Sequence, residues 1–248
     1  MTTMIPTTRS ARPAISYNAL AADVYPARIV RFVGLGVQDQ PEFQGQKKEP
    51  AFKCAIQFEL IGVDATGTKA DGTPIDPRPA CVFQDYFLFP GASRGKVFDM
   101  CKVIDPSIDA TPRSLDWFIE HLNSIVMVQV GTYQTRDGVT KNKVVSVQPV
   151  PGFIRSTVGE ARSDIVGFNP YVDNEEALSA YNKLFQFQRT ILEQAHDRAY
   201  IPLAGKEPEA PQLSMTFAPK EQAAPSPTPK APEMPVEGVE GFDDDMPF

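Results

Sequence analysis

The clearest pattern along the chain is an alternation of apolar and polar positions between Phe52 and Leu60. The apolar side chains stand at every second position, and the positions between them hold Lys53, Ala55, Gln57 and Glu59. Successive side chains of a β-strand point to opposite faces, so a period of two residues is typical of a strand. The pattern predicts a strand over 52–60 with one buried face and one face in water.

Four further segments have the composition of strands. They are rich in β-branched and aromatic residues, end at turn residues, and occupy 24–35, 81–89, 124–135 and 143–147. The pair Asp137-Gly138 stands between the last two, which is typical of a hairpin turn. Apolar residues spaced by three and four positions predict helices over 94–104 and 114–122.

The order of these elements predicts the fold class. Three strands, a helical insert and a two-stranded hairpin are the order of an OB fold, a five-stranded Greek-key barrel with a helix between strands 3 and 4. We therefore expect a mainly β protein with an OB-fold barrel over residues 23–152. A small β-sandwich with a helical crossover has the same order of elements and remains an alternative.

Three segments flank this predicted domain. Residues 1–22 are expected to form a flexible N-terminal arm. Residues 153–201 are expected to form a connecting segment and an amphipathic helix over 174–199, which packs on the barrel or forms a dimer contact. Residues 202–248 are dominated by proline, alanine and charged residues. They predict a disordered linker, because few large apolar side chains are present to offset the entropy of ordering.

The net charge of −7 is unevenly distributed along the chain. Residues 1–152 contain 16 basic and 15 acidic side chains, whereas residues 202–248 contain 3 basic and 9 acidic ones. The acidic character thus belongs to the C-terminal segment. The charge of the predicted barrel is compatible with a polyanionic ligand if its basic side chains gather on one face.

The chain ends in a short motif that joins three carboxylates to an apolar terminus. Its residues are Asp243, Asp244, Asp245, Met246, Pro247 and Phe248. A terminal phenylalanine ring fits an apolar pocket, and the free α-carboxylate pairs with an arginine beside such a pocket. The motif is therefore expected to be a recognition peptide for partner proteins.

This ending resembles the acidic tip of bacterial and bacteriophage single-stranded DNA-binding proteins, with Met246 where isoleucine is usual. The chain length, the insert at 64–79 and the helix at 174–199 favour a bacteriophage version over the compact bacterial type. The resemblance implies sequence-independent coating of single-stranded DNA in replication, recombination and repair. It also implies recruitment of proteins of those processes through the tip, in the cytoplasm of a bacterial host.

The DNA-binding face is predicted from strand parity and from the two loops that flank the binding face of an OB fold. Single strands are held by basic side chains together with exposed aromatic rings. Parity places Lys53 and Gln57 on the outward face of their strand and favours exposure of Tyr86 and Tyr133. The complete predicted set is Phe43, Lys47, Lys48, Lys53, Gln57, Tyr86, Tyr133, Arg136, Lys141 and Lys143.

Other chemistries find little support in the sequence. There is no Ser/His/Asp set, phosphate-binding loop or dinucleotide motif, so we expect no enzymatic activity and no cofactor. Cys54, Cys81 and Cys101 lack the spacing of metal ligands and are expected to be reduced core thiols. No apolar run approaches the length of a membrane span. A protein-interaction adaptor and a nuclease or strand-annealing recombination protein remain alternatives, and the oligomeric state, including a homo-oligomer, stays open.

Overall fold

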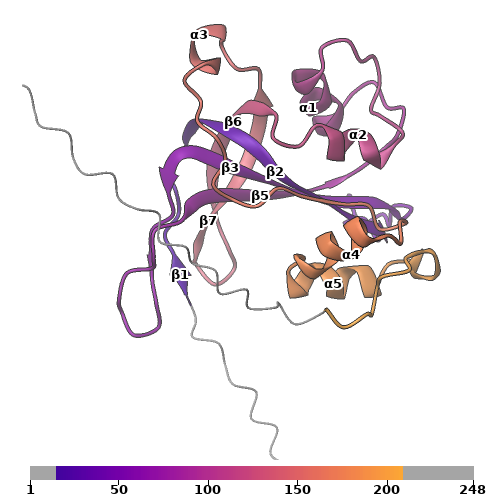
Figure 1. Cartoon of the computed structure of the whole chain (residues 1–248). Coiled ribbons are helices and arrows are strands. Elements are labelled where there is room, and N and C mark those ends of the chain that lie inside the picture. Colours follow the sequence, from indigo (N-terminus) through magenta and orange to yellow (C-terminus); the bar gives the residue numbers. More distant parts are fainter. Residues whose placement is uncertain (1–14, 209–248) are drawn as a thin grey trace, which may run out of the picture. The chain divides into compact units, whose positions relative to one another are not determined.

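The computed structural model describes residues 15–208 of the 248-residue chain. Five long strands form most of one sheet: β2 (Asp23–Gln38), β3 (Ala51–Asp64), β5 (Pro79–Phe87), β6 (Ile125–Gln134) and β7 (Thr140–Gln148). They pair antiparallel in the order β5-β3-β2-β6-β7. The predicted strands are confirmed, and the chain is a mainly β protein with a large antiparallel sheet and few helices (Figure 1). Within residues 15–208, no ladder joins the edge strands β5 and β7.

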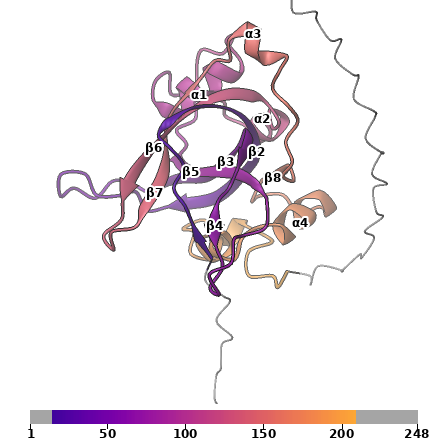
Figure 2. The ribbon, with the colours of Figure 1, turned by 90° about the vertical axis from the view of Figure 1, so that its left-hand side faces the viewer.

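Strand β2 is the central element of the sheet. One edge pairs with β3, while the other edge pairs first with β6 and then, over Arg31–Val33, with the short parallel strand β8 (Val166–Phe168). A bulge between Ile29 and Arg31 shifts the register by one residue. Ala27 and Ile29 before the bulge therefore contact the same core as Phe32 after it. Figure 2 shows how strongly β2 and β3 curve.

The inner face of the sheet packs against two helices between β5 and β6. These are α1 (Lys96–Ile104) and α2 (Leu115–Glu120), close to the predicted positions. Met100 and Cys101 of α1 and Phe118 of α2 enter a core with alternate residues of the five strands. The ring of Phe118 stacks on Phe32 with centroids 4.9 Å apart. Burial of this apolar surface supplies the main driving force for closing the helices over the sheet.

The outer face of the sheet is covered by residues 159–206, called here the C-terminal layer. It comprises β8, α4 (Glu175–Asn182), α5 (Gln186–Glu193) and the 3-10 turn η1 (Arg198–Tyr200), and it is preceded by α3 (Gly152–Arg155). Side chains of the layer form a second core with Val33, Leu35 and Ala55 of the sheet. Both faces of β2 and β3 are therefore buried.

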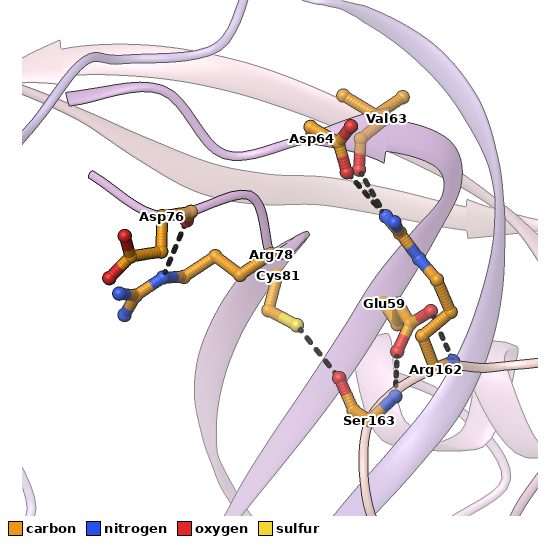
Figure 3. Close-up of polar contacts among 8 residues, drawn as sticks. All are labelled: Glu59, Val63, Asp64, Asp76, Arg78, Cys81, Arg162 and Ser163. Atoms are coloured by element: carbon orange, nitrogen blue, oxygen red, sulfur yellow. Dashed lines mark hydrogen bonds and ion pairs between the residues drawn. The ribbon is translucent and has the colours of Figure 1, made fainter. Parts of the chain in front are cut away.

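Hydrogen bonds attach the C-terminal layer to polar side chains of the sheet. Glu59 is 1% exposed, and its two carboxylate oxygens accept bonds of 2.7 Å from the backbone N–H groups of Arg162 and Ser163 (Figure 3). Arg162 pairs with Asp64 at 2.6 Å. The Arg28 guanidinium donates to the carbonyl oxygen of Gly159 at 2.8 Å. Polar residues on the outer face of the sheet thus bond to protein rather than to water.

The helix predicted over 174–199 is two helices with a break between Asn182 and Gln186. At the break, the carbonyl oxygen of Lys183 accepts a bond from Arg31, and that of Leu184 accepts one from Arg189. Side chains thus satisfy carbonyl groups that a continuous helix would bond internally. Of the two predicted placements, the one on the sheet is observed. No helix in the described part of the chain is long and apolar enough to cross a membrane.

The end of the predicted N-terminal arm is part of the fold. Strand β1 (Ser16–Tyr17) pairs with β4 (Gly67–Thr68), which lies in the insert at 64–79. The Tyr17 hydroxyl accepts a bond from Arg78 at 2.8 Å, and Leu20 bonds to Asn142 through its backbone. Residues 1–14 of the arm and 209–248 of the predicted linker and tip lie outside the described residues.

Candidate nucleic-acid interface

Three residues of the predicted DNA-binding set share one face of the β6–β7 hairpin. Tyr133 lies directly opposite Lys141, and Gly131 lies opposite Lys143, so their side chains project from the same side of the ladder. Tyr133 is 44% exposed and both lysines are exposed. Within residues 15–208 neither lysine forms an ion pair. The hairpin therefore presents an aromatic ring beside two free ammonium groups.

Two details of the hairpin fix this arrangement. A Cβ atom added at Gly131 would lie 3.6 Å from Cε of Lys143, so the lysine stem runs across the space that the glycine leaves. At the tip, the N–H of Thr135 donates to the carbonyl of Val139 at 2.9 Å, and Gly138 has a φ of 75°. The predicted Asp-Gly turn is confirmed, and Arg136 is exposed within it.

The loop between β2 and β3 presents a second aromatic and basic group. Phe43 and Gln46 exchange two backbone hydrogen bonds of 3.0 Å, and the residues between them, Gln44 and Gly45, have φ values of 52° and 75°. Positive φ at both central positions is typical of a type I′ turn. The turn leaves Phe43 59% exposed, with the ammonium group of Lys48 4.8 Å from its ring centroid. Lys47 is exposed and pairs with Asp39 at 3.7 Å.

The part of the predicted face on β3 is not available to DNA. Gln57 is 8% exposed, because the C-terminal layer covers the outer face of the sheet, so its predicted outward placement in water was wrong. Lys53 is half-buried at the end of the same face, and its ammonium group pairs with Asp85 at 2.7 Å. Its charge is thus largely matched within the fold.

Tyr86 was predicted to be exposed because it shares strand parity with Gln84, and that prediction was wrong. In β5, the residues of this parity face the inner core, and Tyr86 is 8% exposed. Burial raises the pKa of its hydroxyl well above the usual range. The exposed ring of this strand is Phe83 on the opposite face, whose ring contacts that of Phe185 in the C-terminal layer.

The structure adds a groove that the sequence did not single out. It has a volume of about 320 Å³ and lies where β5 ends and α1 begins. Phe89, Arg94, Lys96 and Phe98 line it. A sequence signal was present, because aromatic and basic residues alternate with small ones over the segment 87–98. That segment was interpreted only as a strand end followed by a helix.

Two of the three cysteines are fully buried in the inner core, as expected of structural thiols. Burial raises the pKa of Cys54 strongly and that of Cys101 to about 12, so both stay protonated at neutral pH. Cys81 is only half-buried, and its sulfur lies 3.7 Å from the hydroxyl of Ser163. The predicted partner-binding residues Asp243–Phe248 lie outside the described residues.

Comparisons with protein-family models, curated proteins and solved structures found no match to this chain. The function is therefore argued from the geometry and chemistry of the residues themselves.

Proposed function

We propose that this chain binds single-stranded DNA without sequence preference and carries out no catalysis on it. The observation that carries the proposal is the hairpin face, where exposed Tyr133 stands beside Lys141 and Lys143. An exposed ring stacks on any unpaired base, and the ammonium groups neutralise the adjacent phosphates. Such contacts do not depend on the base sequence, because every base has an aromatic face.

The strand order supports an OB-type fold for this sheet. Counted along the chain from β2, the five long strands stand in the order 3-2-1-4-5, with α1 and α2 between the third and fourth. This is the order of an OB fold. In that fold, the loop between the first two strands and the hairpin between the last two flank the ligand face. Here the first of these loops presents Phe43 with Lys48, and the hairpin presents Tyr133 with Lys141 and Lys143.

The test of this function compares single-stranded with double-stranded oligonucleotides bound to the full chain. Stacking requires unpaired bases, so we expect much tighter binding to single strands. The logarithm of the binding constant is expected to fall with the logarithm of salt concentration by about 0.7 for each phosphate neutralised. Equal affinity for duplex, or an affinity that does not respond to salt, would contradict the proposal.

The second part of the proposal is recruitment of replication, recombination and repair proteins through Asp243–Phe248. It is supported by the chemistry of this segment, which combines three carboxylates with the aromatic ring of Phe248. Because Phe248 carries the apolar contact and no side-chain charge, Phe248→Ala is expected to remove most partner affinity while DNA affinity stays unchanged. Binding of purified host partners is compared for the full chain, Phe248→Ala and a chain lacking 243–248. Equal binding by all three would refute this part.

A role as a protein-interaction adaptor is the second candidate, because one exposed aromatic cluster is formed by β5 and the C-terminal layer rather than by the hairpin. Phe83, Phe185 and Phe187 are all exposed, and the last two rings stack in parallel with centroids 5.7 Å apart. Surface clusters of aromatic rings are common at protein interfaces. Absence of DNA binding together with partner binding that Phe187→Ala abolishes would favour this candidate over the first.

A further inference from the structure

The groove at the junction of β5 and α1 has walls held in place by backbone hydrogen bonds. The N–H of Ala92 donates to the carbonyl of Phe89 across the Pro90-Gly91 turn. On the other side, the N–H of Gly91 donates to the carbonyl of Thr111, and the N–H of Thr111 donates to that of Ala92, both at 2.8 Å. The segment that carries Phe89 is therefore fixed before any ligand arrives, which lowers the entropy cost of binding.

The lining of the groove combines an open aromatic ring with free positive charge. Phe89 is 50% exposed, and Arg94 and Lys96 are exposed. Among the described residues, neither of these two cations forms an ion pair. The one carboxylate in the lining, Asp85, is paired with Lys53. The net charge offered to a ligand is thus positive.

A polar group in the lining also lacks a protein partner. Tyr86 is more than nine-tenths buried and lines the groove, and its hydroxyl makes no hydrogen bond within residues 15–208. The hydroxyl keeps contact with solvent at the groove, so it is free to bond to water or to a ligand with polar edges. The groove therefore offers an aromatic stacking surface, two cations and a hydrogen-bonding hydroxyl in one place.

We propose that this groove is a contact site for single-stranded DNA, where Phe89 stacks on an unpaired base while Arg94 and Lys96 pair with adjacent phosphates. The Tyr86 hydroxyl bonds to the edge of that base. This inference rests on the proposed function and extends it to a surface that the sequence did not indicate. Strand β7 of the hairpin contacts both β5 and α1, so the groove and the hairpin face belong to neighbouring elements.

The test uses variants of the full chain with matched controls. Phe89→Ala removes the ring, and Phe153→Ala removes another exposed ring, on α3, outside the groove lining. A stacked base is worth ~1–3 kcal/mol, so Phe89→Ala is expected to weaken oligo-dT binding about fivefold or more, and Phe153→Ala to leave it unchanged. Arg94→Ala with Lys96→Ala is expected to reduce the salt slope by about 1.4, because two phosphate contacts are lost.

A fluorescent variant provides a direct readout of the contact. Phe89→Trp keeps a stacking surface, so it is expected to retain affinity for oligo-dT. Its tryptophan fluorescence is expected to fall when oligo-dT binds, by more than that of wild type does. Phe153→Trp is expected to show no such change. Melting temperatures of all variants establish that they fold. If Phe89→Ala lowers the melting temperature, the fluorescence of the Phe89→Trp variant decides whether DNA contacts position 89.

The outcomes separate this inference from the proposed function. The groove inference alone would be overturned if wild type binds oligo-dT tightly, Phe89→Ala binds it equally well, and oligo-dT does not quench Phe89→Trp. Failure of wild type to bind oligo-dT would overturn both. Quenching by a peptide of residues 241–248, but not by oligo-dT, would show that the groove binds an acidic peptide and would also overturn the inference.

Discussion

Glu59 places a carboxylate in the interior of the protein, between the sheet and the C-terminal layer. Its oxygens accept two backbone hydrogen bonds and are not paired with a basic side chain in the described part of the chain. A buried charge is tolerated only where hydrogen bonds replace those of water. Removal of the carboxylate deprives the backbone N–H groups of Arg162 and Ser163 of their shared acceptor, so this residue holds the layer at a defined position.

Glu59→Ala is expected to lower the free energy of unfolding by about 2–4 kcal/mol, because two part-buried backbone donors lose their acceptor and a fully buried side chain is truncated. Urea denaturation of the full chain measures this change. Glu160→Ala is the matched control, since its exposed carboxylate also bonds across the same interface, to Arg28. Because this carboxylate stands in water and Arg28 keeps its bonds to the carbonyl groups of Gly159 and Asn123, the loss is expected to cost about 1 kcal/mol or less. Equal effects of the two substitutions would show that Glu59 is not an anchor.

Tyr133→Ala is expected to weaken binding of single-stranded DNA by about 1–3 kcal/mol, the contribution of one stacked base. The melting temperature is expected to stay near that of wild type, because the ring is exposed. Tyr200→Ala, which removes an exposed tyrosine from the C-terminal layer, is the control. Fluorescence anisotropy with a labelled oligonucleotide measures affinity. Loss of folding in Tyr133→Ala, or equal affinity of both variants, would contradict the assignment.

The sequence predicted exposure correctly for residues near turns. It predicted exposure incorrectly for Gln57, which lies under the C-terminal layer, and for Tyr86, which lies in the inner core. Tyr133 and Phe43 stand at hairpin ends, where no later segment up to residue 208 covers them. Gln57 occupies a polar position in an alternating strand, as a residue exposed to water would. Its burial depends on residues about a hundred positions later, which the local period of two does not reveal.

Strand β8 illustrates how close packing sets the position of a short element. Val166 and Phe168 are buried in the outer core, while Gly167 lies against α2. A Cβ atom at position 167 would lie 2.6 Å from Cγ2 of Ile119. The absence of a side chain thus allows the strand to pair with β2 and to contact α2 at the same time.

Gly167→Ala is expected to destabilise the fold by about 1–3 kcal/mol, because the added methyl group overlaps a β-branched side chain that has little freedom to move. Gly159→Ala is the control, since a Cβ atom there would lie 3.6 Å from Ile61, an ordinary contact distance. Thermal melts of both variants provide the comparison. A melting temperature of Gly167→Ala equal to that of Gly159→Ala would show that β8 has room to shift.

Long elements were predictable from the sequence, and short ones were not. Strand β3 and helix α1 show several repeats of their period, and the other long strands are rich in β-branched and aromatic residues. Strands β1, β4 and β8 have only two or three residues, too few for any period to appear. The break between α4 and α5 interrupts a continuous apolar stripe. It depends on guanidinium groups from β2 and α5, and therefore on tertiary contacts.

At the scale of the whole molecule, the predicted domain over 23–152 shares one of its two cores with the C-terminal layer. Its outer face includes Val33, Leu35 and Ala55, which are buried only by residues of the C-terminal layer. The last buried residues of that layer, Leu203 and Ala204, lie beyond the predicted boundary at 201. The apolar stripe of the segment 174–199 indicated that it packs against another surface. Strand parity, however, predicted that the outer face of the sheet, which is that surface, lies in water.

A chain ending at residue 208 is expected to melt at the temperature of the full chain, because it retains both cores. A chain ending at residue 152 is expected to lose cooperative melting or to aggregate, since its outer face exposes apolar side chains and the unpartnered Glu59. Calorimetry and size-exclusion chromatography measure both properties. A soluble, cooperatively melting chain of residues 1–152 would show that the sheet and α1–α2 are sufficient for stability.

One edge of β2 pairs with both β6 and β8, and β8 is synthesised much later than β2. The stretch Arg31–Val33 is made long before β8, which pairs with it in the finished protein. Until the ribosome has produced residue 168, the backbone N–H and C=O groups of this stretch have no β8 to pair with. An open strand edge is a template for pairing with a second nascent chain, and a charged side chain on that edge discourages such pairing. Arg31 is the charged residue of this stretch, and in the finished protein its guanidinium donates to the carbonyl of Lys183 in the C-terminal layer.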